Sequence, residues 1–268
     1  MPNLVEKTAE NLQLIRNSKP LIHNITNFVV MNYTANVLLA MGASPVMAHA
    51  ENEVEEMVSF AGSLVLNIGT LSNSWIDAMI IAGRKSTKLG TPIVLDPVGS
   101  GATTLRTSAA KRIIDETVVS VIRGNSSEIL SLGHNDSITK GVDAMHTVDD
   151  AADTGSLLAK ELGTTLAVTG PVDLITDGSR IVRVENGHSM MPLVTGTGCS
   201  ATAAIGAFAA VEKDMVAAAA GALAFIGLAG EKAGEKAAGP GSFMVELLDA
   251  LYTLTSEDLI TGCRIVEG

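Results

Sequence analysis

Short apolar runs, spaced through residues 20–170, restrict the fold of this chain more than any other feature. Segments with helical periodicity separate the runs, and turn-forming or polar residues follow most of them. Strands that are apolar on both faces and alternate with helices are typical of a parallel sheet covered on both sides. The sequence therefore predicts a three-layer α/β/α fold with a mostly parallel central sheet, and with strands at 20–26, 44–50, 63–69, 91–97, 117–125 and 165–170.

One segment breaks this alternation. DLITDGSRIVRVEN places two strand-like runs around Asp177-Gly178, which predicts a hairpin that adds antiparallel strands at one edge of the sheet. After His188 the chain reads as a helical block, and the polar segment 133–141 is typical of a surface connection. No repeat, linker or shift in composition divides the 268 residues, so we expect a single domain over 1–268.

Composition favours a small-molecule partner. A net charge of −11 and the lack of basic patches argue against nucleic acid. The most apolar run, 216–230, lies between charged residues and is short for a bilayer span, so we expect a buried helix and no membrane. Residues 1–13 lack an apolar export segment, which favours a cytoplasmic location. Cys199 and Cys263 lie far apart, without the spacing of a zinc site or a disulfide framework.

The segment VTGTGCSATAAIGAFAA, which begins at Val194, indicates where a ligand could bind. Gly196 and Gly198 would let backbone N–H groups face a bound anion, and the helix that follows adds unpaired donors at its positive end. A tight turn into a close-packed helix would explain the same glycines. GTGCSA also fits a dinucleotide fingerprint, but it lies late in the chain and no strand with an acidic end follows it, which disfavours an oxidoreductase.

Polar residues at the predicted strand ends are the other candidates, because ligands of open parallel sheets bind there. Asp96 follows a buried run and could face Mg²⁺ that carries phosphate oxygens, or could cap a turn. Arg123 ends a hydrophobic strand and needs a partner that a phosphate would supply. Asn125 and Glu128 have the spacing of a capping box. Metal-ligand spacing is absent among the histidines, His23, His49, His134, His146 and His188.

Taken together, these segments resemble those of one family. HNITNFVVMNYTANVLLAMGASPVM, LNIGTLS, LDPVGSGAT, IRGNSSEI, VTGTGC and GPGSF occur in the order and spacing of the hydroxyethylthiazole kinases, a thiamine-salvage family with a ribokinase-like fold. The resemblance implies transfer of the ATP γ-phosphoryl group to the alcohol of 4-methyl-5-(2-hydroxyethyl)thiazole, with Mg²⁺. It also implies a homotrimer with active sites between subunits.

The resemblance assigns binding roles to particular residues. The family's ATP contacts fall on Arg123 and Thr169, and its thiazole contacts fall on Met47 and Gly196. Asn27 lies in the ITN segment that the family uses near the thiazole pocket.

It also assigns catalytic and metal roles. Asp96 and Glu128 match the acidic positions that organise magnesium and its waters, and Cys199 stands where the wider ribokinase-like group has an aspartate that acts as a base. A thiol at a helix N-terminus is expected to have a lowered pKa and could accept or orient the alcohol proton. We expect the N–H cradle of Gly196 to Cys199, which includes Gly198, to matter more, because phosphoryl transfer depends mainly on positioning and charge stabilisation.

Other functions remain open from the sequence. A kinase of the same fold could act on a hydroxymethylpyrimidine or a sugar, for which an aspartate at position 199 and a more polar pocket are expected. A non-catalytic thiazole or thiamine sensor would bind ligand without releasing ADP. The presence of Asp96, Arg123, Thr169 and Cys199 together favours an enzyme.

Overall fold

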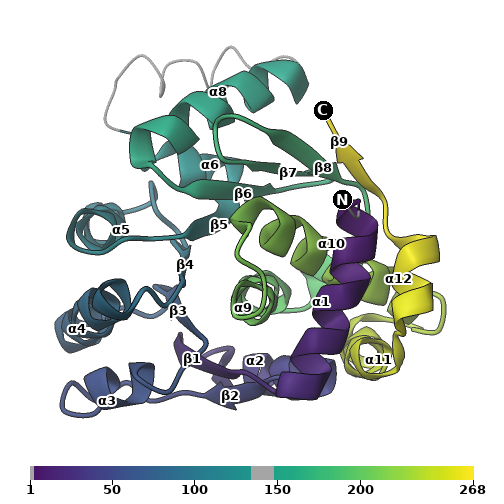
Figure 1. Ribbon diagram of the computed structural model, residues 1–268, viewed down its shortest axis with the longest axis horizontal. Coiled ribbons are helices and arrows are strands. Elements are labelled where there is room, and N and C mark those ends of the chain that lie inside the picture. Colours follow the sequence, from purple (N-terminus) through teal and green to yellow (C-terminus); the bar gives the residue numbers. More distant parts are fainter. Residues whose placement is uncertain (1–2, 134–147) are drawn as a thin grey trace.

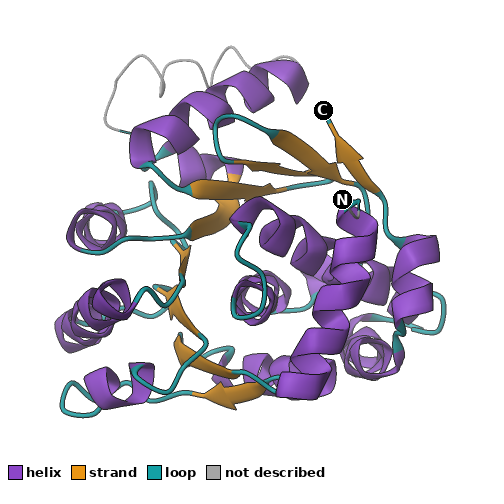
Figure 2. Ribbon diagram, in the orientation of Figure 1, coloured by secondary structure: helices purple, strands orange, loops and turns teal. Residues whose placement is uncertain are grey.

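One sheet divides the molecule into two helical layers (Figures 1 and 2). The computed structural model describes residues 3–133 and 148–268. The connection predicted around 133–141 lies almost wholly outside the described residues, and so do His134 and His146. Within them, nine strands form one sheet in the order β2-β1-β3-β4-β5-β6-β7-β8-β9.

The first six strands in sequence are parallel, as predicted. Each strand is shorter than its predicted run because residues at one or both ends of the run belong to the connecting loops. The run at 44–50 keeps only three strand residues: pairing stops at the register His23↔Val46, and Met47 already belongs to a loop. These strands are β1 (Leu21–Ile25), β2 (Ser44–Val46), β3 (Ser63–Asn67), β4 (Ile93–Asp96), β5 (Val121–Asn125) and β6 (Thr165–Thr169).

The remaining strands are antiparallel and lie at one edge. β7 (Asp173–Thr176) and β8 (Ile181–Val184) form the predicted hairpin. A third strand, β9 (Ile265–Glu267), pairs with β8 and was not predicted. It is three residues long and carries no alternation of its own, so only its pairing with β8 defines it.

Two hydrophobic cores, one on each face of the sheet, confirm the three-layer arrangement. Leu64 and Leu66 of β3 contribute to one core, while Val65 of the same strand contributes to the other. One layer contains α3 (Val54–Val58), α4 (Asn73–Leu89), α5 (Thr104–Glu116), α6 (Ser126–Leu130) and α8 (Val148–Leu162). The other contains α1 (Leu4–Ser18), α2 (Met31–Met41), η2 (Met191–Leu193), α9 (Thr197–Ala209), α10 (Met215–Gly234), α11 (Pro240–Thr253) and α12 (Ser256–Gly262).

Small residues let α9 approach the sheet closely. A Cβ on Gly206 would lie 2.5 Å from Cγ2 of Val65, and its carbonyl accepts a hydrogen bond from the Ser63 hydroxyl at 2.7 Å. Close packing in a core leaves no room for an added methyl group. The start of α9 is therefore held firmly above the carboxyl ends of the central strands.

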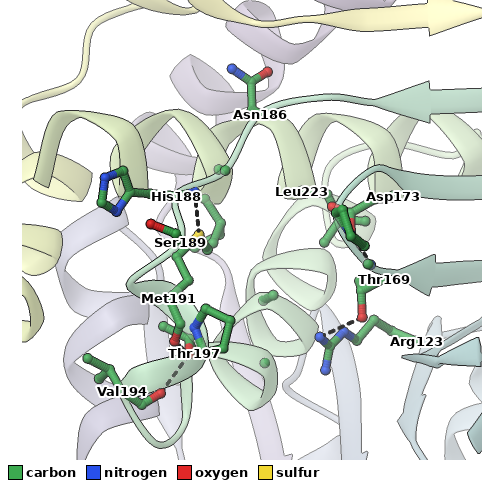
Figure 3. A pocket seen from close by; sticks show the side chains of 18 of the residues that line it. Arg123, Thr169, Asp173, Asn186, His188, Ser189, Met191, Val194, Thr197 and Leu223 are labelled. Atoms are coloured by element: carbon green, nitrogen blue, oxygen red, sulfur yellow. Dashed lines mark hydrogen bonds between the residues drawn. The ribbon is translucent and has the colours of Figure 1, made fainter. Parts of the chain in front are cut away.

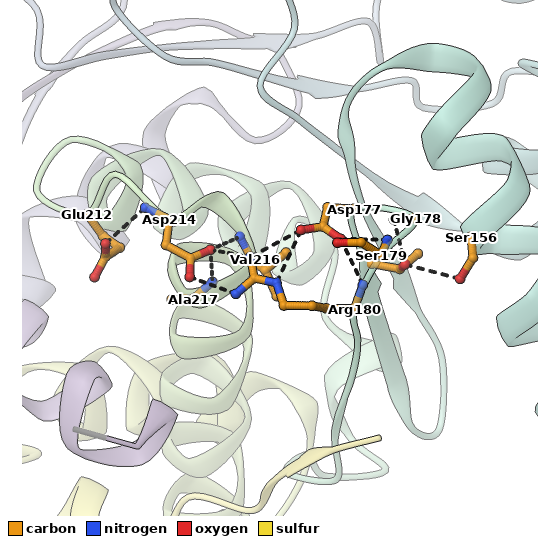
Figure 4. A network of polar contacts seen from close by, with 10 residues as sticks. Ser156, Asp177, Gly178, Ser179, Arg180, Glu212, Asp214, Val216 and Ala217 are labelled. Carbon is orange, nitrogen blue, oxygen red and sulfur yellow. Dashed lines mark hydrogen bonds and ion pairs between the residues drawn. The ribbon is translucent and has the colours of Figure 1, made fainter. Parts of the chain in front are cut away.

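The helix α10 is long and apolar enough to cross a membrane, but 83% of its apolar window is buried inside the protein. It is a core helix, as the run at 216–230 predicted. Asp214 caps its start by accepting hydrogen bonds from the backbone N–H groups of Val216 and Ala217. Arg180, in the β7–β8 turn, donates to both oxygens of Asp214 at 2.8 and 2.9 Å and so ties the hairpin to this helix (Figure 4).

Candidate active site

Asp96 lies at the centre of a buried group of polar side chains. It ends β4, is 1% exposed, and its Oδ2 accepts hydrogen bonds from Asn67 Nδ2 and from Thr202 Oγ1, both at 2.8 Å. Among the described residues, its Oδ1 has no hydrogen-bond partner. Burial raises the pKa of Asp96 to about 6, although the positive charge of Arg123 opposes the shift.

Asn67 extends this group toward β1. Its Oδ1 accepts a hydrogen bond from Asn27 Nδ2 at 2.8 Å, and Asn27 Nδ2 also donates to Cys199 Sγ at 3.6 Å. These side chains meet because β1, β3 and β4 are neighbouring parallel strands that end at the same edge. The group, which we name the polar cluster, consists of Asn27, Asn67, Asp96, Cys199 and Thr202.

The thiol of Cys199 does not have the lowered pKa that its position in the first turn of α9 predicted. Burial raises its pKa to about 11, and the negative charge of Asp96 adds to the shift. The hydrogen bonds from Asn67 and Asn27 only partly oppose these effects. The prediction was wrong because the start of α9 faces the protein interior and a carboxylate, so the thiol is protonated near neutral pH.

The loop before α9 has the geometry that its glycines predicted. Gly196 is the N-cap residue with φ of 92°, a conformation that favours glycine, and no side chain caps the helix. The N–H of Thr197 donates to Val194, and that of Ser200 donates back to Gly196. The N–H groups of the second and third helical residues, Gly198 and Cys199, precede the first intrahelical donor, Ser200, and have no partner among the described residues, so they can bind a ligand.

Arg123 lies directly against this helix start. A Cβ on Gly198 would come within 2.7 Å of its Nη1, so only glycine leaves room for the guanidinium. Its Nη2 donates to Thr169 Oγ1 at 2.8 Å, and its Nη1 lies 3.9 Å from Asp96 Oδ2. Arg123 Nε is buried and has no hydrogen-bond partner among the described residues. The side chain therefore joins β5, β6 and α9.

A pocket of about 840 Å³ opens beside Arg123 and Thr169 (Figure 3). One wall is apolar and comes from α10, where Gly227 is so close to Asn186 that a Cβ would lie 2.6 Å from the Asn186 carbonyl oxygen. Gly196 and Gly198 lie at the end near α9. Pockets of this size hold small molecules, and here the N–H groups of a helix start lie at one end.

Glu128 forms the capping box that its spacing with Asn125 predicted. Its Oε2 accepts from the Asn125 backbone N–H at 2.9 Å, and its Oε1 accepts from the Gly99 N–H at 2.8 Å. The carboxylate thus fastens the loop after β4 to the start of α6. In the part of the chain that the structure describes, no three acidic, histidine or cysteine side chains come together as a preformed metal site.

The predicted site residues fall into four places. Arg123, Thr169, Gly196 and Gly198 line the pocket, whereas Asn27, Asp96 and Cys199 lie in the polar cluster beneath the start of α9. Glu128 lies between the loops after β4 and β5. Met47 is half-buried in the loop after β2 and does not line the pocket.

Sequence reasoning missed two members of the polar cluster as functional residues. Asn67 was recognisable as a strand end, but its hydrogen bonds to two neighbouring strands follow only from the strand order. Thr202 lies on the inward face of α9, one turn after Gly198, and nothing in the sequence indicates that it reaches Asp96.

Comparison with known proteins shows to which family the chain belongs. The family model described as the hydroxyethylthiazole kinase family matches residues 12–257. The chain belongs to this family. It is 68% identical over 268 residues to a hydroxyethylthiazole kinase of Desulfotalea psychrophila, covering all of this chain and 98% of that protein. It is 55% identical over 264 residues to one of Desulfosudis oleivorans, covering 98% of this chain and 96% of that protein.

Solved structures confirm the fold. The structure of a hydroxyethylthiazole kinase protein from Pyrococcus horikoshii is 46% identical and superposes with a TM-score of 0.89, covering 97% of this chain and 98% of that one. A ribokinase-like superfamily protein from Enterococcus faecalis is 13% identical, with a TM-score of 0.67 over 94% of both chains. The second likeness concerns the fold alone, and it confirms the predicted ribokinase-like architecture.

Proposed function

We propose that this kinase transfers the γ-phosphoryl group of ATP to the hydroxyl of 4-methyl-5-(2-hydroxyethyl)thiazole, giving the phosphate ester and ADP in thiamine salvage. The observation that carries the proposal is the pocket that ends at the uncapped start of α9, directly above the polar cluster. Family membership over nearly the whole chain supports the same reaction.

The nucleotide occupies the pocket in this proposal. Its base lies toward the apolar wall of α10, formed by Leu223, Ile226 and Gly227, and its phosphates extend toward Arg123. The Arg123 guanidinium, which lines the pocket, and the N–H groups of Gly198 and Cys199 at the start of α9 are the donors that a terminal phosphate requires. These donors hold their places before ATP arrives, so charge that develops during transfer is stabilised without reorganisation.

The acceptor alcohol lies on the polar-cluster side of the same helix start. Asn27 and Met47 are the proposed thiazole contacts, together with Gly196. Because the thiol of Cys199 is protonated, it orients the acceptor hydroxyl rather than removing its proton. Phosphoryl transfer passes through a loose transition state in most analyses, so a strong base is not required for the reaction.

The residues present fit a magnesium ion. Mg²⁺ is commonly held by one or two carboxylates together with substrate phosphates and water, and the buried Asp96 Oδ1 has no partner among the described residues. We propose that Asp96 holds the ion. Glu128, whose two oxygens already accept backbone N–H groups, supports it through water. When bound, Mg²⁺ neutralises charge between the phosphates.

We further propose a homotrimer with active sites between subunits, located in the cytoplasm. Exposed apolar side chains on the adjoining helices α2 and α11, and before α9, support an interface on this side: Leu39, Val245 and Leu193 are 58%, 54% and 65% exposed. Subunits commonly cover such side chains.

A coupled assay of ADP release tests the proposed function. The thiazole alcohol, hydroxymethylpyrimidine and ribose are compared as acceptors, each with and without Mg²⁺. We expect Mg²⁺-dependent ADP release with the thiazole alcohol at a far higher kcat/KM than with the other two. Preference for the pyrimidine or the sugar would replace this function with the alternative kinase activity, and binding without ADP release would indicate a sensor.

A further inference from the structure

Three aromatic rings join the loops that follow β1, β2 and β3. Trp75, in the first turn of α4, is 7% exposed, and its backbone N–H is capped by Ser72 Oγ at 3.3 Å. The His49 ring stacks on it with centroids 4.1 Å apart and an angle of 29° between the planes. The Phe28 ring packs on it at 4.8 Å and 55°. We name Phe28, His49 and Trp75 the aromatic bridge.

Each outer ring of the bridge is attached to a proposed thiazole contact. Phe28 follows Asn27 in the chain, and its backbone N–H donates to Thr70 Oγ1 at 3.1 Å. His49 Nδ1 lies 3.2 Å from the carbonyl oxygen of Met47 and can donate to it. Because β2, β1 and β3 are neighbouring parallel strands, the loops after them are adjacent, and Trp75 spans the gap between the loops of Asn27 and Met47.

A second contact holds the loop of Met47 from below. His23 of β1 is fully buried, and its Nε2 donates to the Ala48 carbonyl oxygen at 2.8 Å. The hydrogen bond restrains the backbone between Met47 and His49 on the β1 side. The stack on Trp75 restrains the same segment on the β3 side, so the loop has two anchors, at Ala48 and His49, directly after Met47.

We propose that the aromatic bridge is a positioning element that sets the separation of Asn27 and Met47, and thereby the affinity for the acceptor alcohol. This inference rests on the proposed function, because it takes those two residues as thiazole contacts. Phe28 is 65% exposed and His49 is also exposed, so their packing contributes little to the core. Their common feature is the contact with Trp75, which links the loops after the paired strands β1 and β2 to the start of α4.

Steady-state kinetics with His49→Ala, His49→Phe and Trp75→Leu tests the proposal. Loss of one aromatic contact should raise KM for the thiazole alcohol about two- to tenfold in His49→Ala. KM for ATP, measured at saturating alcohol, should stay at the wild-type value because the nucleotide pocket lies over β5, β6 and α10. A phenylalanine at position 49 retains a ring on Trp75, so His49→Phe should recover most of the lost affinity.

The double variant His49→Ala/Trp75→Leu tests whether His49 and Trp75 affect KM through their contact with each other or independently. If both side chains act through one contact, the double variant should have nearly the same KM for the alcohol as Trp75→Leu alone. Phe60→Ala is the matched control, because Phe60 is an exposed aromatic after α3, 69% exposed and outside the bridge. It should leave both KM values unchanged.

The single tryptophan supplies a direct binding readout. Addition of the thiazole alcohol without ATP should change the Trp75 emission of the wild-type enzyme, and the titration of His49→Ala should show the same rise in Kd as the kinetics. The inference fails if His49→Ala behaves like Phe60→Ala, if both KM values rise equally, or if His49→Phe recovers nothing. If the wild-type enzyme releases no ADP with the thiazole alcohol, the proposed function itself fails, which is a distinct result.

Discussion

Gly198→Ala should weaken the use of ATP far more than it weakens the fold. The added Cβ would lie 2.7 Å from Nη1 of Arg123, closer than real Cβ contacts allow, and 3.1 Å from Nη2. Both atoms are at the end of a flexible side chain, so the guanidinium moves and the helix does not. The movement takes Arg123 away from its hydrogen bond with Thr169 and from the end of the pocket at α9.

The size of the effect follows from the contact that is lost. A charge-assisted hydrogen bond between the Arg123 guanidinium and a phosphate oxygen of ATP contributes about 1.5–3 kcal/mol, so its loss corresponds to a fall of about 10- to 150-fold in kcat/KM for ATP. Alanine is a better helix former than glycine by up to about 1 kcal/mol, which offsets part of the lost hydrogen bond between Arg123 and Thr169, so the Tm of Gly198→Ala should fall only slightly. Activity should therefore fall far more than stability.

The assay is ADP release against ATP concentration at saturating thiazole alcohol, with Tm measured on the same samples. Gly241→Ala is the matched control, since Gly241 is also the second residue of its helix and nothing lies within 4 Å of an added Cβ. Gly206→Ala is the contrasting variant, because its Cβ would meet Val65 in the core and should lower Tm. The reasoning would be refuted if Gly198→Ala kept the wild-type kcat/KM for ATP, or if its loss of activity were explained by an equally large loss of stability, seen as a lowered Tm.

Three further predictions concern single side chains. Cys199→Ala should lower kcat yet leave measurable activity; an inactive variant that still binds ATP would make the thiol indispensable. Asp96→Asn should abolish most turnover with a smaller effect on folding, and unchanged kinetics at limiting Mg²⁺ would argue against a metal role. Hydrogen bonds from Arg180 lower the pKa of Asp214, so this pair stabilises the fold above the unfolded pKa of about 3.9 and loses its effect as pH falls through the folded pKa. Arg180→Met should cost about 1 kcal/mol in urea unfolding near pH 7 and progressively less as pH falls below about 3.9; a cost that does not decrease over this range would contradict the ion-pair account.

Sequence patterns predicted the parallel strands and the hairpin because both depend on local apolar periodicity and turn residues. Asp96 was predicted at the sheet rim for the same reason: it follows a buried strand. β9 carried no such signal, since three residues near the chain end acquire their conformation by pairing with β8. The order and spacing of several motifs along the chain indicated the family, which no single motif could have done.

Properties that depend on tertiary contacts could not be predicted. The pKa of Cys199 was expected to fall because a helix start is positive, but its direction is decided by burial and by Asp96. Asn67 and Thr202 both donate hydrogen bonds to Asp96. These contacts form only when β3, β4 and α9 are packed together, so the sequence alone does not reveal them. Stacking of His49 on Trp75 likewise joins two loops that are distant in sequence.

The central claim is that a free helix start receives the terminal phosphate of ATP, and a crystal structure with Mg²⁺ and a non-hydrolysable ATP analogue tests it most directly. The account predicts that γ-phosphate oxygens accept hydrogen bonds from the backbone N–H groups of Gly198 and Cys199, with Arg123 on the same phosphate chain. A γ-phosphate bound out of hydrogen-bonding reach of residues 196–199 would contradict it.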